Sequence, residues 1–471
     1  MVKGGAPRAS RGVIALVVLF LLSLPAVTVR IYASDEVQYY SYLRSLWFDR
    51  DLSFENEYRH FYDAGITRTP GFHETFLERT TEAGRRINFA TIGCAILWAP
   101  FYAVGDVAAR VSGAPADGYS RPYVASVAYA SALYGFLALL VSIASVRRAG
   151  GRGGPLSAMA TPAVFAVWLG TPLLFYMYVA PPMSHATSAF AVALFVYAWL
   201  RVREGWTPGG FVVLGALAAV MAMVREQDAF FAAGPVVDFA GWWTHADRAA
   251  RRRALAGIAA GIAAFAVCYL PQAIAYESLN GHLGPTRLVA RKMTWTAPHA
   301  VEVVVSSRHG FLVWTPLAAA ALVALAWLPR TARALPSAGR FTAGLAAMVL
   351  LQIYVAGSVE SWTVAGAFGQ RRFIGLTTIL IFGVAAGLAA AHRWGRRAWA
   401  AALALCIWWN LGVMAQFGAG LMNRQRLEPG RIAYTTFVVL PRELPRLAWR
   451  YAFDRRSFYQ ARPAPAGTSG P

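Results

Sequence analysis

Two adjacent carboxylates, Asp35 and Glu36, follow the first apolar run of the chain, which covers residues 12–29. A carboxylate placed at the edge of a membrane can act as a general base that takes the proton from an attacking hydroxyl. Successive side chains of a helix point about 100° apart, so the two carboxylates cannot both face one reacting group. The pair therefore predicts one catalytic residue, Asp35 beside the apolar run, and a supporting neighbour, Glu36.

Other polar residues stand where later apolar runs begin or end. They are His185, Arg225, Arg308, His309, Trp362, Arg371 and Arg372. Ionisable groups at the ends of membrane spans are costly unless they are paired or hydrated, so several at one depth indicate a shared polar cavity. Arginine binds phosphate through two parallel N–H groups and stays charged, which favours a phosphate-bearing substrate. The aromatic rings of Tyr39 and Trp362 are expected to line the site for that substrate.

Each of these residues also has a purely structural interpretation. Asp35, with Gln38 three residues later, suits the capping box of a helix N-terminus. His185 can be a satisfied polar group, and Arg225 can pair with a nearby carboxylate. Arg371 and its neighbour can anchor a span at the membrane interface.

No metal or cofactor is expected from the spacing of the polar residues. Residues 49–51 match the Asp-x-Asp pattern that soluble sugar transferases use with a metal, but no Rossmann-type strand precedes them. The cysteines, Cys94, Cys268 and Cys406, stand in apolar surroundings without Cys-x-x-Cys spacing. They are expected to be buried hydrophobic residues rather than a disulfide framework or a metal site.

The elements that position these residues must be membrane helices. Hydrophobic residues make up 57% of the chain and charged residues 14%, and the mean hydropathy is +0.44. A soluble domain carries about a quarter charged residues. Apolar runs long enough to cross a bilayer recur along the chain. The fold class is therefore expected to be all-α, a polytopic integral membrane protein of about 11 transmembrane helices.

The net charge of +21 comes almost entirely from arginine, gathered in short clusters between the apolar runs. This is the distribution of the positive-inside rule, so the charge indicates a lipid bilayer rather than nucleic acid as the partner. The clusters that fall on one predicted side are 147–152, 201–203, 248–253, 330–340 and 393–397. That side, with the N-terminus, is expected to be cytoplasmic, and the first loop, 31–120, to lie outside.

Residues 1–419 are expected to form the transmembrane domain, followed by an arginine-rich tail over 420–471 whose end is disordered. Nine arginines in the tail fit poorly with the outer side on which the span count places it. In the first loop, residues 36–48 predict an amphipathic helix lying on the membrane. Residues 87–107 predict a second interfacial or re-entrant helix, because counting them as a span would put the arginine clusters outside.

The chain resembles the GT-C superfamily of integral-membrane glycosyltransferases, which includes protein O-mannosyltransferases and the aminoarabinose transferase of lipid A. The resemblance rests on the acidic pair after the first span and on four motifs in order. These are SDEVQYYSYLRSLWFDRDLSFENEY (34–58), PPMSHA (181–186), RHGFLVWTP (308–316) and FGQRRF (368–373). The set is similar to a group of uncharacterised bacterial members.

The resemblance implies an inverting glycosyltransferase in the bacterial cytoplasmic membrane with its active site facing outside. The donor would be a polyprenyl-phosphate sugar, the acceptor a glycan, lipid or protein hydroxyl, and Asp35 the catalytic base. For the motifs around His185 and Arg225, the better-known members of the superfamily suggest no role. No large soluble outer domain follows the spans, so transfer of a whole oligosaccharide is not expected.

Two other classes of protein would also be polytopic. A membrane transporter or lipid flippase of the cell envelope would show two related halves or matching interrupted helices. The acidic first loop has no counterpart in the second half of the chain. A non-catalytic assembly protein would explain the spans but not the polar residues that gather on one side.

Overall fold

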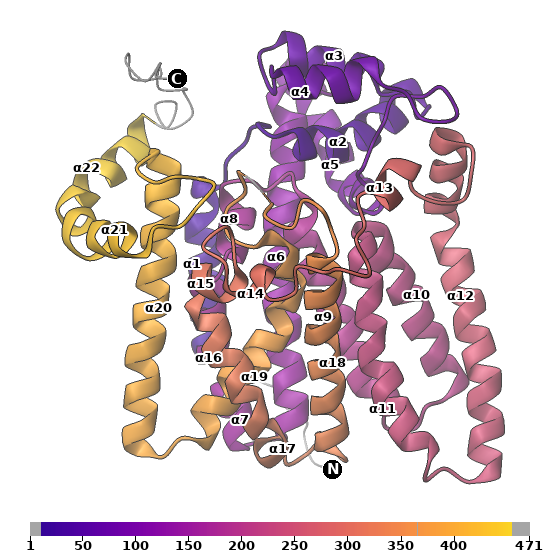
Figure 1. Ribbon diagram of the computed structural model, residues 1–471, viewed down its shortest axis with the longest axis vertical. Helices are drawn as coiled ribbons and strands as arrows, with labels where there is room; N and C mark the ends of the chain where they lie inside the picture. Colours follow the sequence, from indigo (N-terminus) through magenta and orange to yellow (C-terminus); the bar gives the residue numbers. More distant parts are fainter. Residues whose placement is uncertain (1–10, 365, 455–471) are drawn as a thin grey trace.

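The computed structural model describes residues 11–364 and 366–454 and is built of helices (Figure 1). Within these ranges no β-strand forms, and only two isolated β-bridges occur, one of them joining Met293 to Val359. The described part of the chain is thus all-α, as the composition predicts.

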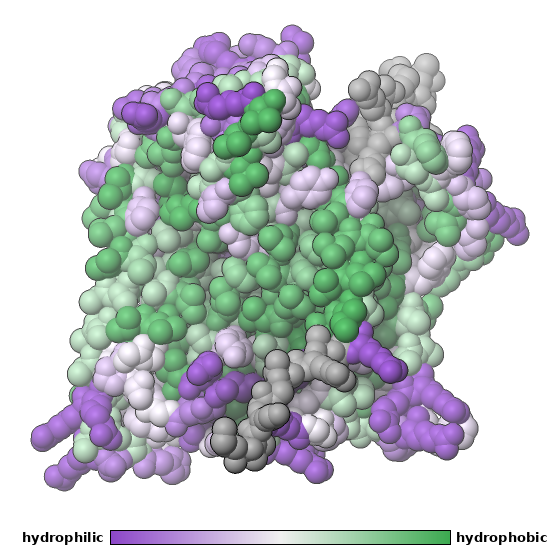
Figure 2. Space-filling model, turned by 180° about the vertical axis from the view of Figure 1, so that it is seen from behind, coloured by the Kyte–Doolittle hydropathy of each residue, from purple (hydrophilic) through white to green (hydrophobic). Residues whose placement is uncertain are grey.

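Seven of the described helices are long and apolar enough to cross a membrane. They are α5 (Gly93–Ser112), α6 (Arg121–Gly150), α9 (Ser184–Val202), α12 (Arg248–Asn280), α18 (Ala338–Gly357), η6 with α19 (Arg371–Ala390) and α20 (Arg393–Ala419). Four shorter apolar helices accompany them, at Arg11–Ala26, Pro155–Gly170, Pro208–Val224 and Pro316–Thr331. Figure 2 shows a broad apolar belt between two hydrophilic ends. These features are those of a polytopic membrane protein; the count of about 11 spans stays a prediction.

The shorter elements complete the chain. Within the apolar helices, the bounds are α1 Arg11–Ser23, η1 Leu24–Ala26, α7 Pro155–Gly170, α10 Pro208–Val224, α16 Pro316–Ala324, η5 Leu325–Trp327, α17 Leu328–Thr331, η6 Arg371–Leu376 and α19 Thr377–Ala390. The others are α2 Ser34–Arg44, η2 Ser45–Asp49, α3 Glu55–Asp63, α4 Pro70–Phe72, η3 His73–Glu78, α8 Leu173–Tyr178, η4 Glu226–Ala232, α11 Ala233–Trp243, α13 Arg287–Arg291, α14 Glu302–Val305, α15 Phe311–Trp314, α21 Pro429–Tyr434, η7 Thr435–Val439 and α22 Leu440–Phe453.

Helix α19 lies in the middle of the bundle, in contact with α7, α16 and α6, and nearly all of its residues are buried. Glycine makes its close approach to α16 possible. A Cβ on Gly383 would lie 2.0 Å from the carbonyl oxygen of Ala321. Small residues let helix backbones approach closely inside membranes. The 3-10 turn η6, which leads directly into α19, begins with the arginine pair of the last predicted loop, so a buried element positions those two side chains.

Helix α5 is long enough to span, and two of its glycines pack closely against other helices. Gly93, its first residue, packs against Met223 at the C-terminal end of α10. Further along, Gly105 packs against Ser126 near the start of α6. Helix α5 therefore runs along the first half of α6, antiparallel to it. By length and composition α5 is a candidate span, so the expectation that residues 87–107 do not cross the membrane stays a prediction.

The arginine clusters meet at the opposite end of the bundle. Arg148, at the end of α6, pairs with Glu204 at 2.5 Å. Arg203, just after α9, forms a buried ion pair with Asp238 of α11 at 2.6 Å. Arg340, in the first turn of α18, lies 3.5 Å from the same carboxylate. These contacts bring together clusters that lie far apart in the sequence, as the positive-inside pattern predicts for one membrane face.

Because the two ends of the bundle differ in charge, the membrane topology can be tested directly. If the arginine end is cytoplasmic, a reporter active only outside should work when fused near Ala83, and a cytoplasmic reporter when fused near Arg251. Protease accessibility of the same two sites in sealed vesicles would check the fusions independently. The inverse pattern would contradict the prediction and move the acidic pair to the cytoplasm, where a nucleotide sugar becomes the plausible donor.

Candidate functional site

Helix α2 begins one residue before the acidic pair, and Glu36 rather than Asp35 satisfies its first turn. The Glu36 carboxylate accepts hydrogen bonds from the backbone N–H groups of Tyr32, at 2.6 Å, and Ala33, at 3.0 Å. Ala33 is the N-cap residue. The prediction that Asp35 caps this helix is therefore wrong. The local reason is that the helix starts at Ser34, which places Glu36 at the third position, where a carboxylate reaches back to the cap.

Asp35, which does not cap the helix, points to the arginine pair at the start of η6, just before α19. One oxygen of its carboxylate lies 2.6 Å from an Nη atom of Arg371. The Asp35 side chain is 38% exposed and that of Arg371 22% exposed, so the ion pair remains accessible. The first loop and the last predicted loop, distant in sequence, thus meet at one point.

Hydrogen bonds from two glutamines hold the backbone around this point. The Gln227 side chain donates to the carbonyl oxygen of Arg372 at 2.7 Å. Gln352 of α18 in turn donates to the backbone oxygen of Gln227 at 2.9 Å. The segment after α10 and the start of η6 are therefore fixed relative to each other. This fixing brings Arg225 close to Arg371 and Arg372.

Arg225, Arg371 and Arg372, here called the arginine cluster, act on one another electrostatically and on Asp35. Within the described residues no carboxylate pairs with Arg225. Its guanidinium donates to Gln227 at 3.1 Å, while Asp228 accepts from Ser188 at 2.5 Å. With Asp35 as the only ion-paired carboxylate at the cluster, positive charge is in excess. Such an arrangement suits an anionic ligand.

Several buried polar atoms beside the arginine cluster have no hydrogen-bond partner among the described residues. They are Nη1 of Arg225, Nε of Arg372 and Nδ1 of His185. Buried polar groups in native proteins are almost always hydrogen-bonded. A concentration of unpaired polar atoms therefore marks a place where a polar ligand can bind.

His185 and two tyrosines complete the surroundings. His185, at the start of α9, is buried and lies in the electrostatic range of all three arginines of the cluster. The ring of Tyr176 packs edge-on against it, with centroids 4.4 Å apart. Tyr39 of α2 is near Asp35 and Arg225. Burial raises the pKa of Tyr39 above its usual value, so its hydroxyl stays a neutral hydrogen-bonding group.

The remaining predicted residues lie around the arginine cluster rather than in it. Arg308 is exposed, and no side-chain contact joins it to the cluster within the described ranges. His309 is buried, stacks on Trp314 with centroids 4.6 Å apart, and its Nε2 bonds to the carbonyl oxygen of Ala367 at 2.9 Å. Trp362 stacks against His299. The structure thus brings together Asp35, Tyr39, His185 and the arginine cluster, and leaves these three at the rim.

A cavity of about 1100 Å³ opens beside the ion pair. Its walls are mostly apolar and come from α1, α8, α20 and α22. The end of the cavity nearest the ion pair includes Glu36, Tyr176 and Met183. The sulfur of Met183 lies 3.7 Å from Arg371, which ties the cavity to the arginine cluster. An apolar chamber that ends at clustered positive charge can hold a molecule with a long apolar part and an anionic head.

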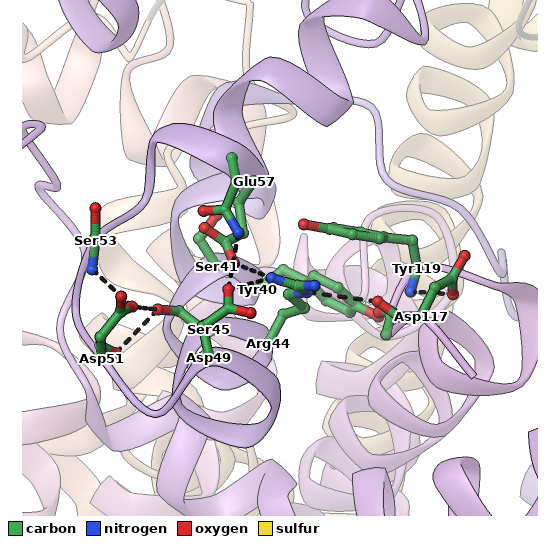
Figure 3. A network of polar contacts seen from close by, with 12 residues as sticks. Tyr40, Ser41, Arg44, Ser45, Asp49, Asp51, Ser53, Glu57, Asp117 and Tyr119 are labelled. Carbon is green, nitrogen blue, oxygen red and sulfur yellow. Dashed lines mark hydrogen bonds and ion pairs between the residues drawn. The ribbon is translucent and has the colours of Figure 1, made fainter. Parts of the chain in front are cut away.

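The loop that carries the acidic pair is held by a second polar network, centred on Arg44 (Figure 3). Arg44, at the end of α2, pairs with Asp49 and, at 3.0 Å, with Glu57 of α3. It also lies over the ring of Tyr119, 4.8 Å from the centroid. This network joins α2 to α3 and to the loop before α6, and so it fixes the direction of α2.

The same network explains the Asp-x-Asp pattern. Asp49 accepts from Arg44 and from Asn56, at 2.8 Å, while Asp51 binds Ser45 at 2.8 Å and Ser53 at 3.1 Å. Both carboxylates are thus used in local contacts. No group of three or more His, Cys, Asp or Glu side chains placed to hold a metal occurs in the described residues.

Helix α2 is less exposed than its sequence pattern predicts. Tyr40, Ser41 and Tyr42, which as consecutive residues point in different directions around the helix, are all fully buried. The Tyr40 hydroxyl donates to the carbonyl oxygen of Gly118 at 2.5 Å. The expectation of a polar face open to water is therefore wrong for α2, because α3 and the loop before α6 cover that face. The position of α2 at the membrane surface stays a prediction.

Burial gives Glu36 a pH-dependent effect on stability. Desolvation raises the pKa of its carboxyl to about 7, against the lowering effect of the Tyr32 and Ala33 N–H groups. The folded state therefore holds this proton more tightly than the unfolded chain does. The associated stability is fully present below pH 4.5 and is lost as the pH rises through about 7.

We therefore expect the Glu36→Gln variant, which resembles the protonated residue, to lose less stability than the wild type between pH 5 and pH 8. The expected difference is roughly 3 kcal/mol in the free energy of unfolding across that interval. Thermal unfolding in detergent at several pH values measures it, with Glu74→Gln, an exposed acid of the same loop, as the control. Parallel pH curves for wild type and Glu36→Gln would contradict the expectation.

Comparisons with known proteins give this chain no family assignment. No family model matches the sequence, no curated protein is similar to it at a significant level, and no solved structure matches its fold. The resemblance to the GT-C superfamily therefore rests on the motifs alone, and the function must be argued from the geometry of the site.

Proposed function

We propose that this protein is an inverting glycosyltransferase that moves a sugar from a polyprenyl-phosphate donor to a hydroxyl of a cell-envelope acceptor. The observation that carries the proposal is the Asp35–Arg371 ion pair, which stands where the arginine cluster meets the apolar cavity. One accessible carboxylate, an excess of positive charge and a lipid-sized chamber meet there. These are the three features that a lipid-linked, phosphate-activated sugar and a hydroxyl acceptor require.

The donor would bind with its lipid in the cavity and its phosphate at the arginine cluster. The volume of about 1100 Å³ and the apolar walls suit a branched hydrocarbon chain. Arg371 lies at the junction, and Arg225 is buried with an unpartnered Nη atom. Guanidinium groups form paired hydrogen bonds with phosphate oxygens, so each can hold the phosphate in a fixed orientation.

The reaction would proceed by direct displacement. As the acceptor oxygen forms its bond to the anomeric carbon, the bond from that carbon to the phosphate oxygen breaks. The electron pair stays on the phosphate, which leaves as polyprenyl phosphate, and the acceptor proton passes to Asp35. General-base help of this kind contributes roughly 10²–10⁴-fold to the rate. Arginine beside the leaving phosphate stabilises the charge that develops on it.

The ion pair itself fits this sequence of events. A phosphate that engages Arg371 competes with Asp35 for the same guanidinium. Donor binding would therefore loosen the pair and free the carboxylate to accept a proton. In the absence of donor, the pair keeps both charges partnered at a partly buried position, where isolated charges are costly.

The wider setting follows from the arrangement of the helices. The proposed site lies at the end of the bundle opposite the loop arginines around Arg148, Arg203 and Arg340. The positive-inside rule assigns that other end to the cytoplasm. The active site would then face outward from a bacterial cytoplasmic membrane, in a bundle of about 11 spans. At that surface, lipid-linked sugars rather than nucleotide sugars are the available donors.

Purified protein in nanodiscs, supplied with a panel of polyprenyl-phosphate monosaccharides, tests the proposal. We expect release of polyprenyl phosphate that depends on Asp35, and lipid analysis of a deletion strain to show an envelope component that lacks one sugar. Movement of intact donor across proteoliposomes, without release of polyprenyl phosphate and without dependence on Asp35, would contradict the proposal and favour a flippase.

A further inference from the structure

The segment that follows α20 is folded, and it forms part of the wall of the apolar cavity. The sequence predicts only an arginine-rich tail over 420–471, and its predicted disordered end, 462–471, lies outside the described residues. Three helical elements, α21, η7 and α22, occupy 429–453 at the same end of the bundle as the first loop (Figure 1).

Specific contacts fix this segment to the transmembrane helices. The Gln416 side chain of α20 donates to the hydroxyl of Thr436 at 2.8 Å, and Trp408 donates to the backbone oxygen of the same residue at 3.2 Å. At the far end, the Tyr451 hydroxyl donates to the carbonyl oxygen of Ala26, after α1, at 2.7 Å. Helix α22 therefore bridges α20 and α1 beside the cavity.

Helix α22 has two opposite faces. Leu440, Leu447 and Tyr451, spaced seven and four residues apart, share one face. Leu440 is buried, and the other two line the cavity. The opposite face is formed by four exposed residues spaced four, three and four positions apart: Arg442, Arg446, Trp449 and Phe453.

The exposed face joins arginine to large aromatic rings. Trp449 is 65% exposed and Phe453 71% exposed, and their ring centroids lie 4.2 Å apart. Arg446 is 3.8 Å from Glu443, an exposed pair that contributes little. Over residues 420–454 six arginines stand against three acidic residues. The outer face of α22 therefore presents net positive charge together with exposed aromatic area.

We infer that this face of α22, formed by Arg442, Arg446, Trp449 and Phe453, binds the headgroups of anionic phospholipids. The position at one end of the apolar belt places it at the depth of the headgroups. Arginine and tryptophan on one helix face are typical of a helix that lies in an anionic membrane surface. The arginines point away from the cavity, so the proposed donor phosphate does not explain them, and the inference does not depend on the proposed activity.

This binding explains why the tail departs from the positive-inside rule. Arginines on the outer side are unfavourable as free charges during insertion, but they are neutralised once anionic headgroups surround them. Because the other face of α22 lines the cavity, the lipid that holds the helix also determines the position of that wall.

Hydrogen exchange of the full-length protein in nanodiscs tests the inference. The discs contain phosphatidylcholine alone, or phosphatidylglycerol in place of about one lipid in three. We expect amides of α22 to exchange about tenfold more slowly in the anionic discs. The protection should disappear in Arg442→Gln/Arg446→Gln and weaken at high salt. Arg396→Gln/Arg397→Gln, exposed at the other end of the bundle, is the matched control and should keep it.

Three outcomes would overturn the inference. The first is equal exchange of α22 in both kinds of disc. The second is unchanged protection in Arg442→Gln/Arg446→Gln when the exchange of buried helix α19 shows that the fold is intact. The third is equal protection by free inorganic phosphate in phosphatidylcholine discs, which would indicate a soluble anion instead of a membrane lipid.

Discussion

The Asp35→Asn variant should fold and insert normally but transfer sugar at least roughly 10²-fold more slowly than the wild type. Asparagine keeps the shape of the side chain and can still accept from Arg371, which binds Asp35 at 2.6 Å. It removes only the proton acceptor. Because Glu36, and not Asp35, satisfies the first turn of α2, the helix loses nothing in the exchange. Initial rates with a purified donor, at matched protein amounts, measure the effect.

The controls for this experiment come from the same loop. Asp63→Asn replaces an exposed acid of α3 and should leave turnover unchanged. Glu36→Gln should lose less activity than Asp35→Asn, because its carboxylate is turned toward the backbone of Tyr32 and Ala33. Near-normal turnover in Asp35→Asn would contradict the role of Asp35 as the general base. Loss of activity in Glu36→Gln alone would leave the proposed activity in place but assign the role of the base to Glu36.

The second large effect is expected from Arg371. Arg371→Ala should lower kcat/KM for the donor by roughly 10²–10³-fold, because it removes a charged donor of hydrogen bonds from the leaving phosphate. Arg371→Lys keeps the charge but loses the planar fork, so donor affinity should fall while part of kcat remains. Steady-state kinetics with varied donor concentration separates the two. Arg121→Lys, an exposed arginine at the start of α6, is the control.

A double-mutant cycle with Asp35 extends this test. If donor phosphate displaces Asp35 from Arg371, the losses in Asp35→Asn and Arg371→Ala should be far from additive. Purely additive losses would show that the ion pair is unrelated to catalysis. Full activity in both Arg371→Ala and Arg372→Ala would show that this arginine pair does not bind the donor and would favour its interpretation as an interface anchor.

The sequence was sufficient for the class of the fold and for the grouping of the arginines at one end. Both depend on composition and on hydrophobic runs, which are properties of the chain itself. The burial of α2 could not be predicted in this way, because Tyr40 and Ser41 are covered by segments that approach from elsewhere in the chain.

The site was predicted in part. The types of Asp35, Arg225 and Arg371 indicate chemistry at an interface, but only the fold shows which oxygen meets which nitrogen. Gln227 and Gln352, which fix the backbone beside Arg372, carry no charge or motif that would single them out. Tyr176 and Met183 were missed for a similar reason, since an apolar or aromatic residue in an apolar run has no distinguishing pattern.

The distance in sequence between Asp35 and Arg371 has a consequence for biosynthesis. The ribosome makes the two residues roughly three hundred positions apart, which at roughly 5–20 residues per second is an interval of tens of seconds. The contacts of Arg44 with Asp49 and Glu57 are local, so the first loop can fold during that time. Asp35, however, cannot form its ion pair with Arg371 until η6 and α19 have been synthesised and inserted. Nascent chains that stop before residue 371 would thus carry an ordered first loop and no complete site, which makes premature termination products inactive rather than partly active.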